Sequence, residues 1–105
     1  RWVRSVAPGE NIVSTLPDGR YGVWSGTSMS APIVSGIAAL VLQIRPLNLP
    51  NRTMSAVVEE IEETGYGWEC NVPSRNIFMK TARVDAFRAV MNIQTNTPQQ
   101  PACLP

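Results

Sequence analysis

The 105-residue chain contains no histidine, the side chain that most often acts as a general base near neutral pH and as a ligand for transition metals. Its two cysteines, Cys70 and Cys103, are far apart and form no C-x-x-C motif, so neither a zinc site nor a dithiol redox site is expected. We predict no metal site and no cofactor in this chain. A disulfide between Cys70 and Cys103 is also predicted, and it would require an oxidising compartment.

An excess of one charge and a long apolar run are lacking too. Nine basic and eight acidic residues give a formal net charge of +1, and the basic ones are scattered along the chain. This distribution provides no electrostatic footprint for nucleic acid or an anionic membrane. The longest apolar run, 33–44, is shorter than the roughly 20 residues of a membrane span and is interrupted by Ser35 and Gly36. We therefore expect a core helix and no membrane span.

The first quarter of the chain is typical of short strands joined by turns. A short apolar segment at 3–7 is followed by Pro8-Gly9 and by the pair Ile12-Val13. Proline presets φ and glycine supplies positive φ, so Pro17-Asp18-Gly19 predicts a turn. The aromatic and β-branched stretch 21–24 predicts the strand that follows it.

Three helices are predicted in the rest of the globular portion. The first is apolar on nearly every face and ends at Arg45-Pro46, because the residue before a proline is driven out of the helical region. The second helix is amphipathic, and the third has a weaker helical pattern. Since the first helix is too apolar for the few elements around it, we expect part of its covering to lie outside this chain. The predicted helices comprise 33–44 with a start near residue 28, about 51–65, and about 83–91.

Two further features of the second half each allow more than one interpretation. The acidic cluster within 59–63 lies on the polar side of the second helix and indicates a solvated face rather than a metal site. The tripeptide Asn51-Arg52-Thr53 matches the N-glycosylation pattern, but the same residues suit the start of a helix, and both interpretations stay open. Residues 93–105 are polar and proline-rich, which predicts a tail or linker after a globular portion at 1–92.

Several hydroxyl side chains stand between the predicted strand at 21–24 and the first helix. One interpretation is helix capping, but a single cap would account for only one of them. In the other interpretation one serine is a nucleophile at the start of the helix, where the chain arrives from the strand through Gly26. Its Oγ would lie at an exposed edge, and free backbone NH groups would face a developing oxyanion. Pro32 suits a place early in the helix because it has no NH. Spacing alone leaves both open for Ser25, Thr27, Ser28 and Ser30.

Three blocks of the chain resemble, in order and spacing, the C-terminal part of the subtilisin-like serine peptidases, the subtilases. The resemblance is strong over 3–46 and weak at 83–86. It implies an α/β fold, namely part of a subtilisin-like three-layer arrangement with the end of a parallel sheet, a buried central helix after the nucleophile, and peripheral helices. The blocks are Ala7-Pro8-Gly9, Ile12-x-Ser14-Thr15, and Ser25 to Pro32 with Val34-x-Gly36 following.

The resemblance implies roles for residues of the last block. Ser28 matches the nucleophile of the family, and its own backbone NH would form half of the oxyanion hole. Gly26, Thr27 and Pro32 would support the motif. The family commonly has a histidine at the position of Ile33, but that histidine is not catalytic, so the assignment of Ser28 stands.

A serine hydroxyl needs a base, and this chain has no histidine. The resemblance therefore implies that the aspartate, histidine and asparagine partners precede Arg1, and that residues 1–92 are the C-terminal portion of a catalytic domain. We expect a fragment of a secreted, extracellular serine endopeptidase that cleaves protein or peptide substrates through an acyl-enzyme. Alone the chain would be inactive, and calcium is a candidate ligand of the complete enzyme.

Two alternatives to this expectation stay open. One is a non-catalytic subtilase-like subunit or interaction module. The other is an unrelated small α/β binding domain in which the hydroxyl cluster only caps a helix.

Overall fold

The computed structural model describes residues 3–72 and 77–94, and for 68–72 and 77–81 it describes the backbone alone. Within this part of the chain the elements are, in order, β1 (Ser5–Val6), β2 (Ile12–Leu16), the 3₁₀ turn η1 (Pro17–Gly19), β3 (Arg20–Trp24), α1 (Thr27–Ile44), α2 (Met54–Thr64), β4 (Tyr66–Val72), β5 (Ile77–Arg83) and α3 (Ala86–Met91).

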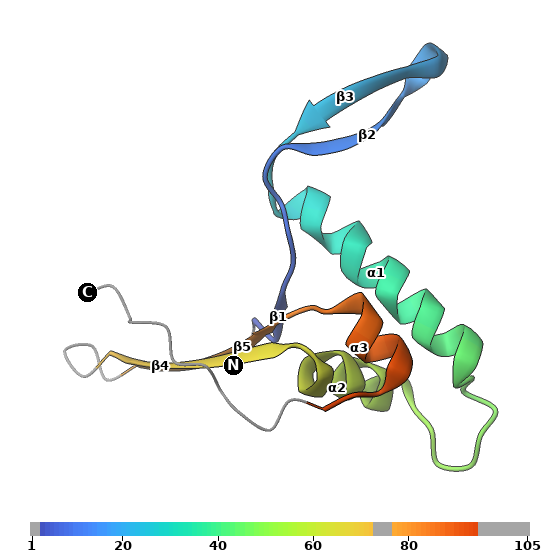
Figure 1. Cartoon of the computed structure of the whole chain (residues 1–105), viewed down its shortest axis with the longest axis vertical. Helices are drawn as coiled ribbons and strands as arrows, with labels where there is room; N and C mark the ends of the chain where they lie inside the picture. The colour runs from blue at the N-terminus through green and yellow to red at the C-terminus, as the bar shows by residue number, and fades with distance from the viewer. Residues whose placement is uncertain (1–2, 73–76, 95–105) are drawn as a thin grey trace.

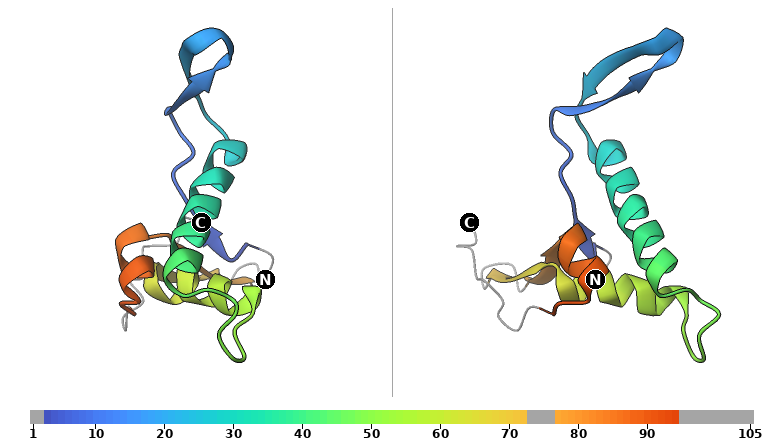
Figure 2. Two further views of the ribbon diagram at one scale, coloured as in Figure 1. Left: turned by 90° about the vertical axis from the view of Figure 1, so that its right-hand side faces the viewer. Right: turned by 45° about the vertical axis from the view of Figure 1, so that its right-hand side comes forward.

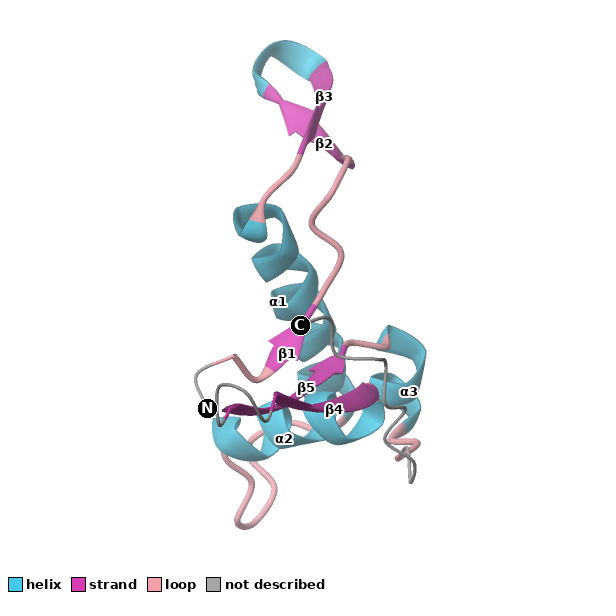
Figure 3. Cartoon of the chain, turned by 90° about the vertical axis from the view of Figure 1, so that its left-hand side faces the viewer, coloured by secondary structure: helices cyan, strands magenta, loops and turns pink. Residues whose placement is uncertain are grey.

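The strands form two separate sheets. β1 pairs with β5 in parallel, with Ser5 opposite Ala82 and Val6 opposite Arg83, and β4 adds to β5 antiparallel. Figure 3 shows this sheet with α2, which packs against β4 and β5. The second sheet is the antiparallel β2–β3 hairpin, which Figure 1 shows beyond the first turn of α1 and away from the other strands. The mixed helices and the parallel β1–β5 pair confirm the predicted α/β class.

The core lies where the three helices meet. Its buried residues are Ile37 and Val41 of α1, Val57 and Ile61 of α2, and Ala89 of α3. Val41 and Val57 are completely shielded from solvent. Full burial of a valine side chain contributes about 1.5–3 kcal/mol to the stability of a fold. This small cluster therefore holds the C-terminal half of α1 against α2 and α3.

Most of α1 is not covered by the described residues. Apart from Ile37 and Val41 its side chains are exposed or half-buried, and Leu40 and Ile44 are 47% and 54% exposed. Among the described residues α1 is the one helix long and apolar enough to cross a membrane by length and composition, a test that core helices of globular proteins also pass. The exposed apolar faces fit the expectation that further covering lies outside this chain.

Local signals placed several boundaries correctly. The turn predicted at 17–19 is present, with positive φ at Asp18 and Gly19. The first helix ends at Ile44 as predicted, and the second begins after Thr53, whose Oγ1 accepts a hydrogen bond from the backbone NH of Ala56 at 3.3 Å.

The region after α2 differs from the sequence-based expectation. The β4–β5 hairpin was not predicted, and the third helix begins at Ala86, so its predicted start at Arg83 was wrong. Arg83 instead lies in β5 opposite Val6. Asp85 caps α3, since its Oδ1 accepts a hydrogen bond from the backbone NH of Arg88 at 2.9 Å. The predicted tail lies largely outside the described residues, and so does the predicted disulfide, for which neither the Cys70 side chain nor Cys103 is described.

An ion cluster joins the C-terminal ends of α1 and α3 to the middle of α2. Arg45, directly after α1, places its Nε 2.5 Å from Oε1 of Glu60 in α2. The same guanidinium donates to the carbonyl oxygens of Ala89 (2.6 Å) and Val90 (3.0 Å) near the end of α3. Arg52 completes the cluster, with its Nη2 2.5 Å from Oε2 of Glu60 and its Nε donating to the Arg45 carbonyl at 2.7 Å.

Candidate active site

A glycine forms the corner between β3 and α1. Gly26 has φ 152° and ψ 167°, a backbone region that is essentially restricted to glycine. Its NH donates to the carbonyl of Gly9 at 2.6 Å, and its own carbonyl accepts from the NH of Met29 at 3.1 Å. Only Ser25 and Gly26 therefore separate the end of β3 from the first residue of α1.

We expect Gly26→Asn to destabilise the fold by about 1–3 kcal/mol, because a Cβ forces strain on this backbone conformation. The strain is conformational, since the nearest atom to a Cβ at this position, other than those of its neighbours, would be Met29 Sδ at 3.7 Å. The matched control is Gly19→Asn, because the φ of 69° at Gly19 is one that asparagine tolerates and the space around it is open. Chemical denaturation of both variants measures the loss in unfolding free energy. Equal losses in the two variants would contradict backbone strain at residue 26 as the cause.

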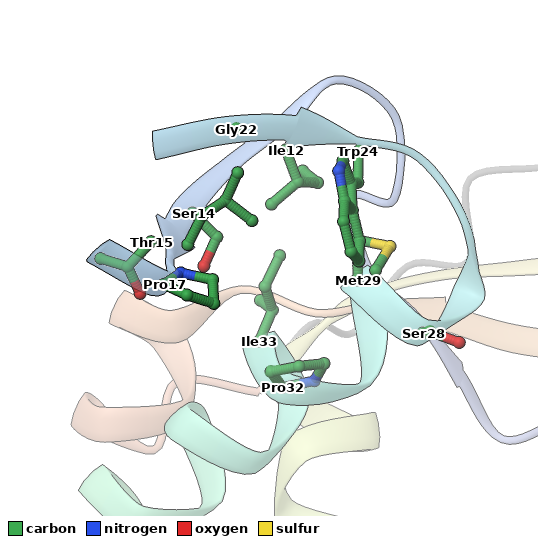
Figure 4. A pocket seen from close by; sticks show the side chains of 11 residues that line it. Ile12, Ser14, Thr15, Pro17, Gly22, Trp24, Ser28, Met29, Pro32 and Ile33 are labelled. Atoms are coloured by element: carbon green, nitrogen blue, oxygen red, sulfur yellow. The ribbon is translucent and has the colours of Figure 1, made fainter. Parts of the chain in front are cut away.

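Ser28 is the second residue of α1. At this position the backbone NH has no intrahelical acceptor, and the positive end of the helix dipole lies beside it. The side chain is exposed, and its Oγ makes no hydrogen bond within the part of the chain that the structure describes. In Figure 4 the Ser28 hydroxyl points away from the neighbouring apolar side chains. An unengaged hydroxyl and an available NH thus belong to the same residue.

The other hydroxyls of the cluster do not cap α1. The cap position is occupied by Gly26, and no side chain donates or accepts a capping bond there. Ser25 Oγ accepts instead from the NH of Asn11 at 2.8 Å, which links the two ends of the hairpin. The capping interpretation is therefore wrong for this helix, and Ser28 and Thr27 remain exposed at its first turn.

Ser30 ties a distant segment to the corner. Its Oγ lies 3.1 Å from the carbonyl oxygen of Ala7 and 3.0 Å from that of Pro8. A Cβ on Gly9 would come within 2.3 Å of Ser30 Oγ and 2.8 Å of the Gly26 carbonyl oxygen, so only glycine fits. Sequence reasoning predicted a turn at Pro8-Gly9 but missed this contact, because no local signal shows which distant residue approaches it.

A pocket of about 560 Å³ lies beside Ser28, between the hairpin and the first turns of α1. Figure 4 shows that its walls are mainly apolar. Pro32 contributes to the wall, and its missing NH leaves the carbonyl of Ser28 without the usual helical donor. Sequence reasoning did not predict the pocket. Its main apolar lining residues are Ile12, Leu16, Trp24, Met29, Pro32 and Ile33.

The described residues contain no group of three or more histidine, cysteine, aspartate or glutamate side chains placed to hold a metal ion. The absence of a metal site and of a cofactor stays a prediction for the chain as a whole.

Comparison with known proteins identifies the family. The model of the subtilase family matches residues 2–91. The chain belongs to the subtilase family. The resemblance seen in the sequence is thereby confirmed, and the alternative of an unrelated binding domain is wrong.

Curated relatives match different shares of this subtilase chain. It is 36% identical over 89 residues, 85% of its length, to the thermophilic serine proteinase of Bacillus sp. (strain AK1), of which it covers 20%. It is 45% identical over 58 residues to subtilisin-like protease 3 of Plasmodium falciparum (isolate 3D7), covering 55% of the chain and 7% of that protein. With the major intracellular serine protease of Bacillus subtilis (strain 168) it shares 67% identity over 36 residues, 34% of the chain and 11% of that protein.

The chain thus spans between 7% and 20% of the length of these relatives. Two of their names describe serine proteases or proteinases, the third describes a subtilisin-like protease, and one of the three is described as intracellular. An extracellular location therefore stays a proposal, as do the roles of Ser28, Gly26, Thr27 and Pro32.

Proposed function

We propose that this chain supplies the nucleophile of a serine endopeptidase and that the nucleophile is the Oγ of Ser28. The observation that supports this most directly is the exposed, unbonded Ser28 Oγ at the first turn of α1, next to a backbone NH with no helical acceptor. The membership of the subtilase family and the serine protease relatives support the same reaction class.

In the proposed reaction Ser28 Oγ forms a bond to the carbonyl carbon of a peptide, and its proton passes to a histidine base. The carbonyl oxygen takes up the electron pair and accepts a hydrogen bond from the Ser28 NH, which the helix end favours. Collapse of this intermediate breaks the C–N bond, and the departing amine takes the proton from the histidine. Water then hydrolyses the ester on Ser28 and regenerates the hydroxyl.

The histidine must come from polypeptide other than these 105 residues, which contain none. We propose that it lies, with the orienting aspartate and a second oxyanion donor, in an N-terminal part of the same catalytic domain. That part would also cover the apolar faces of α1 and bind the protein or peptide substrate. We further propose that the complete enzyme is extracellular and that any calcium it holds is bound mainly outside this chain.

Labelling with a fluorophosphonate tests the proposal, since this probe reacts with activated serines. We expect no labelling of the 105-residue chain, because no base is present to remove the Ser28 proton. The complete protease should be labelled on the peptide that contains Ser28, and Ser28→Ala should abolish that label. Labelling of Ser28 in the isolated chain would contradict the requirement for an upstream base.

The absence of histidine also supports the alternative of a non-catalytic subtilase-like subunit or interaction module. The same experiment separates the two. A complete, folded protein that resists the probe and carries other residues at the upstream aspartate and histidine positions would favour the non-catalytic alternative.

A further inference from the structure

The loop between α1 and α2 presents one asparagine outward. Asn51 is exposed and has φ 62°, a left-handed conformation that asparagine adopts more readily than most residues. Figure 2 shows the loop projecting at the end of α1 that is opposite to the β2–β3 hairpin. A bulky group on this side chain would extend into open space around the described chain.

The three side chains of the Asn51-Arg52-Thr53 tripeptide differ in their hydrogen bonding. The Arg52 guanidinium is held by Glu60 and by the Arg45 carbonyl, and the Thr53 hydroxyl caps α2. The Asn51 side chain, in contrast, makes no hydrogen bond within the described part of the chain. The fold therefore accounts for the arginine and the threonine but gives the asparagine amide no partner.

We propose that Asn51 is a site of N-linked glycosylation. The modification requires Asn-x-Thr or Asn-x-Ser without proline in the middle, and this tripeptide has arginine in the middle and threonine in third place. The amide nitrogen of Asn51 forms a bond to the anomeric carbon of an oligosaccharide carried on a lipid pyrophosphate. The bond from that carbon to the pyrophosphate oxygen breaks, the pyrophosphate keeps the electron pair, and the amide releases one proton.

A glycan at Asn51 is compatible with the proposed active site. Helix α1 has 18 residues and separates this loop from Ser28. At 1.5 Å per residue the helix spans about 27 Å, so the sugar lies far from the corner that a substrate would approach. The modification goes beyond the proposed peptidase function, and it rests on the proposed extracellular location being reached through an endoplasmic reticulum that carries the lipid-linked oligosaccharide.

Translation of the 105-residue chain in the presence of endoplasmic-reticulum microsomes tests the proposal. A secretory leader and a linker with one reporter Asn-x-Thr tripeptide precede the chain, so only molecules that enter the lumen carry the reporter glycan. Among these molecules, the native chain should carry a second glycan that endoglycosidase removes. Asn51→Asp, which also tolerates positive φ, should lose that second glycan.

Two variants of the helix cap complete the design. Thr53→Asp keeps a good N-cap but removes the required hydroxyl, so the second glycan should be lost with α2 intact. Thr53→Ser keeps both the cap and the tripeptide, so the glycan should remain. Molecules that carry the reporter glycan alone in the native chain would overturn the proposal, as would a second glycan that survives Asn51→Asp. Neither result bears on Ser28, because the microsomes supply the compartment and no peptidase activity is measured.

Discussion

Replacing Ser28 with alanine in the complete protease is expected to lower kcat by about 10⁶-fold, the scale reported for loss of the serine from a subtilisin triad. This corresponds to about 8 kcal/mol of lost transition-state stabilisation. Alanine removes the Oγ but keeps the backbone NH and the glycine corner, so substrate binding should change little. Steady-state kinetics on a peptide substrate should therefore show the loss in kcat, with KM nearly unchanged.

The matched control is Ser35→Ala. Ser35 lies in the same helix, and its Oγ donates to the carbonyl of Ala31 at 3.1 Å. This substitution makes the same chemical change two turns further along α1, and we expect it to leave kcat within about threefold, a difference below 1 kcal/mol. A Ser28→Ala enzyme that retains a tenth of the native rate would remove Ser28 from the role of nucleophile.

Replacing Glu60 with alanine is expected to destabilise the fold by about 3–5 kcal/mol, because it leaves two partly buried guanidinium groups without their carboxylate. The side chains of Arg45, Arg52 and Glu60 are 22%, 13% and 12% exposed. Glu60 therefore neutralises both arginines in a poorly solvated place. The measurement is urea denaturation of the complete protease in a Ser28→Ala background, which prevents self-digestion.

Two variants separate this effect from a general loss of acidic charge on α2. Glu59→Ala removes the neighbouring, exposed carboxylate and should change the unfolding free energy by less than about 0.5 kcal/mol. Glu60→Gln keeps the shape and one acceptor oxygen but removes the charge and turns the other acceptor into an NH2 donor, so an intermediate loss is expected. Equal effects of Glu59→Ala and Glu60→Ala would show that the ion cluster contributes nothing beyond surface charge.

The sequence alone indicates Ser28 as the candidate nucleophile. The run from Ser25 to Pro32 is specific enough to indicate the family, and the missing histidine limits what this chain can do alone. The structure added the reason that Ser28 differs from its neighbours. Ser25 and Ser30 each have a partner across the fold, whereas Ser28 has none in the described chain.

Boundaries set by neighbouring residues could be read directly. Proline and glycine set the turn at 17–19, Pro46 helps to end α1, and the Thr53 hydroxyl caps α2. Each of these signals acts over at most four residues along the chain, so its geometry follows from local φ and ψ preferences and from hydrogen bonds to nearby NH groups. Amphipathic periodicity likewise indicated the burial of Val57 and Ile61 in α2, although Met54, which belongs to the same periodic pattern, is 49% exposed.

Contacts between distant segments were decided only by the tertiary structure. β5 pairs with β1 across more than seventy residues, Arg45 reaches the carbonyl of Ala89 across 44, and Ser30 reaches that of Ala7 across 23. Such pairings depend on how whole elements pack, and a side chain that donates to a distant carbonyl has the same local sequence signature as one exposed to water. A short motif is therefore enough to indicate the reactive residue. The contacts of Ser30 with the carbonyls of Ala7 and Pro8, and the pocket beside Ser28, form only when distant segments pack together.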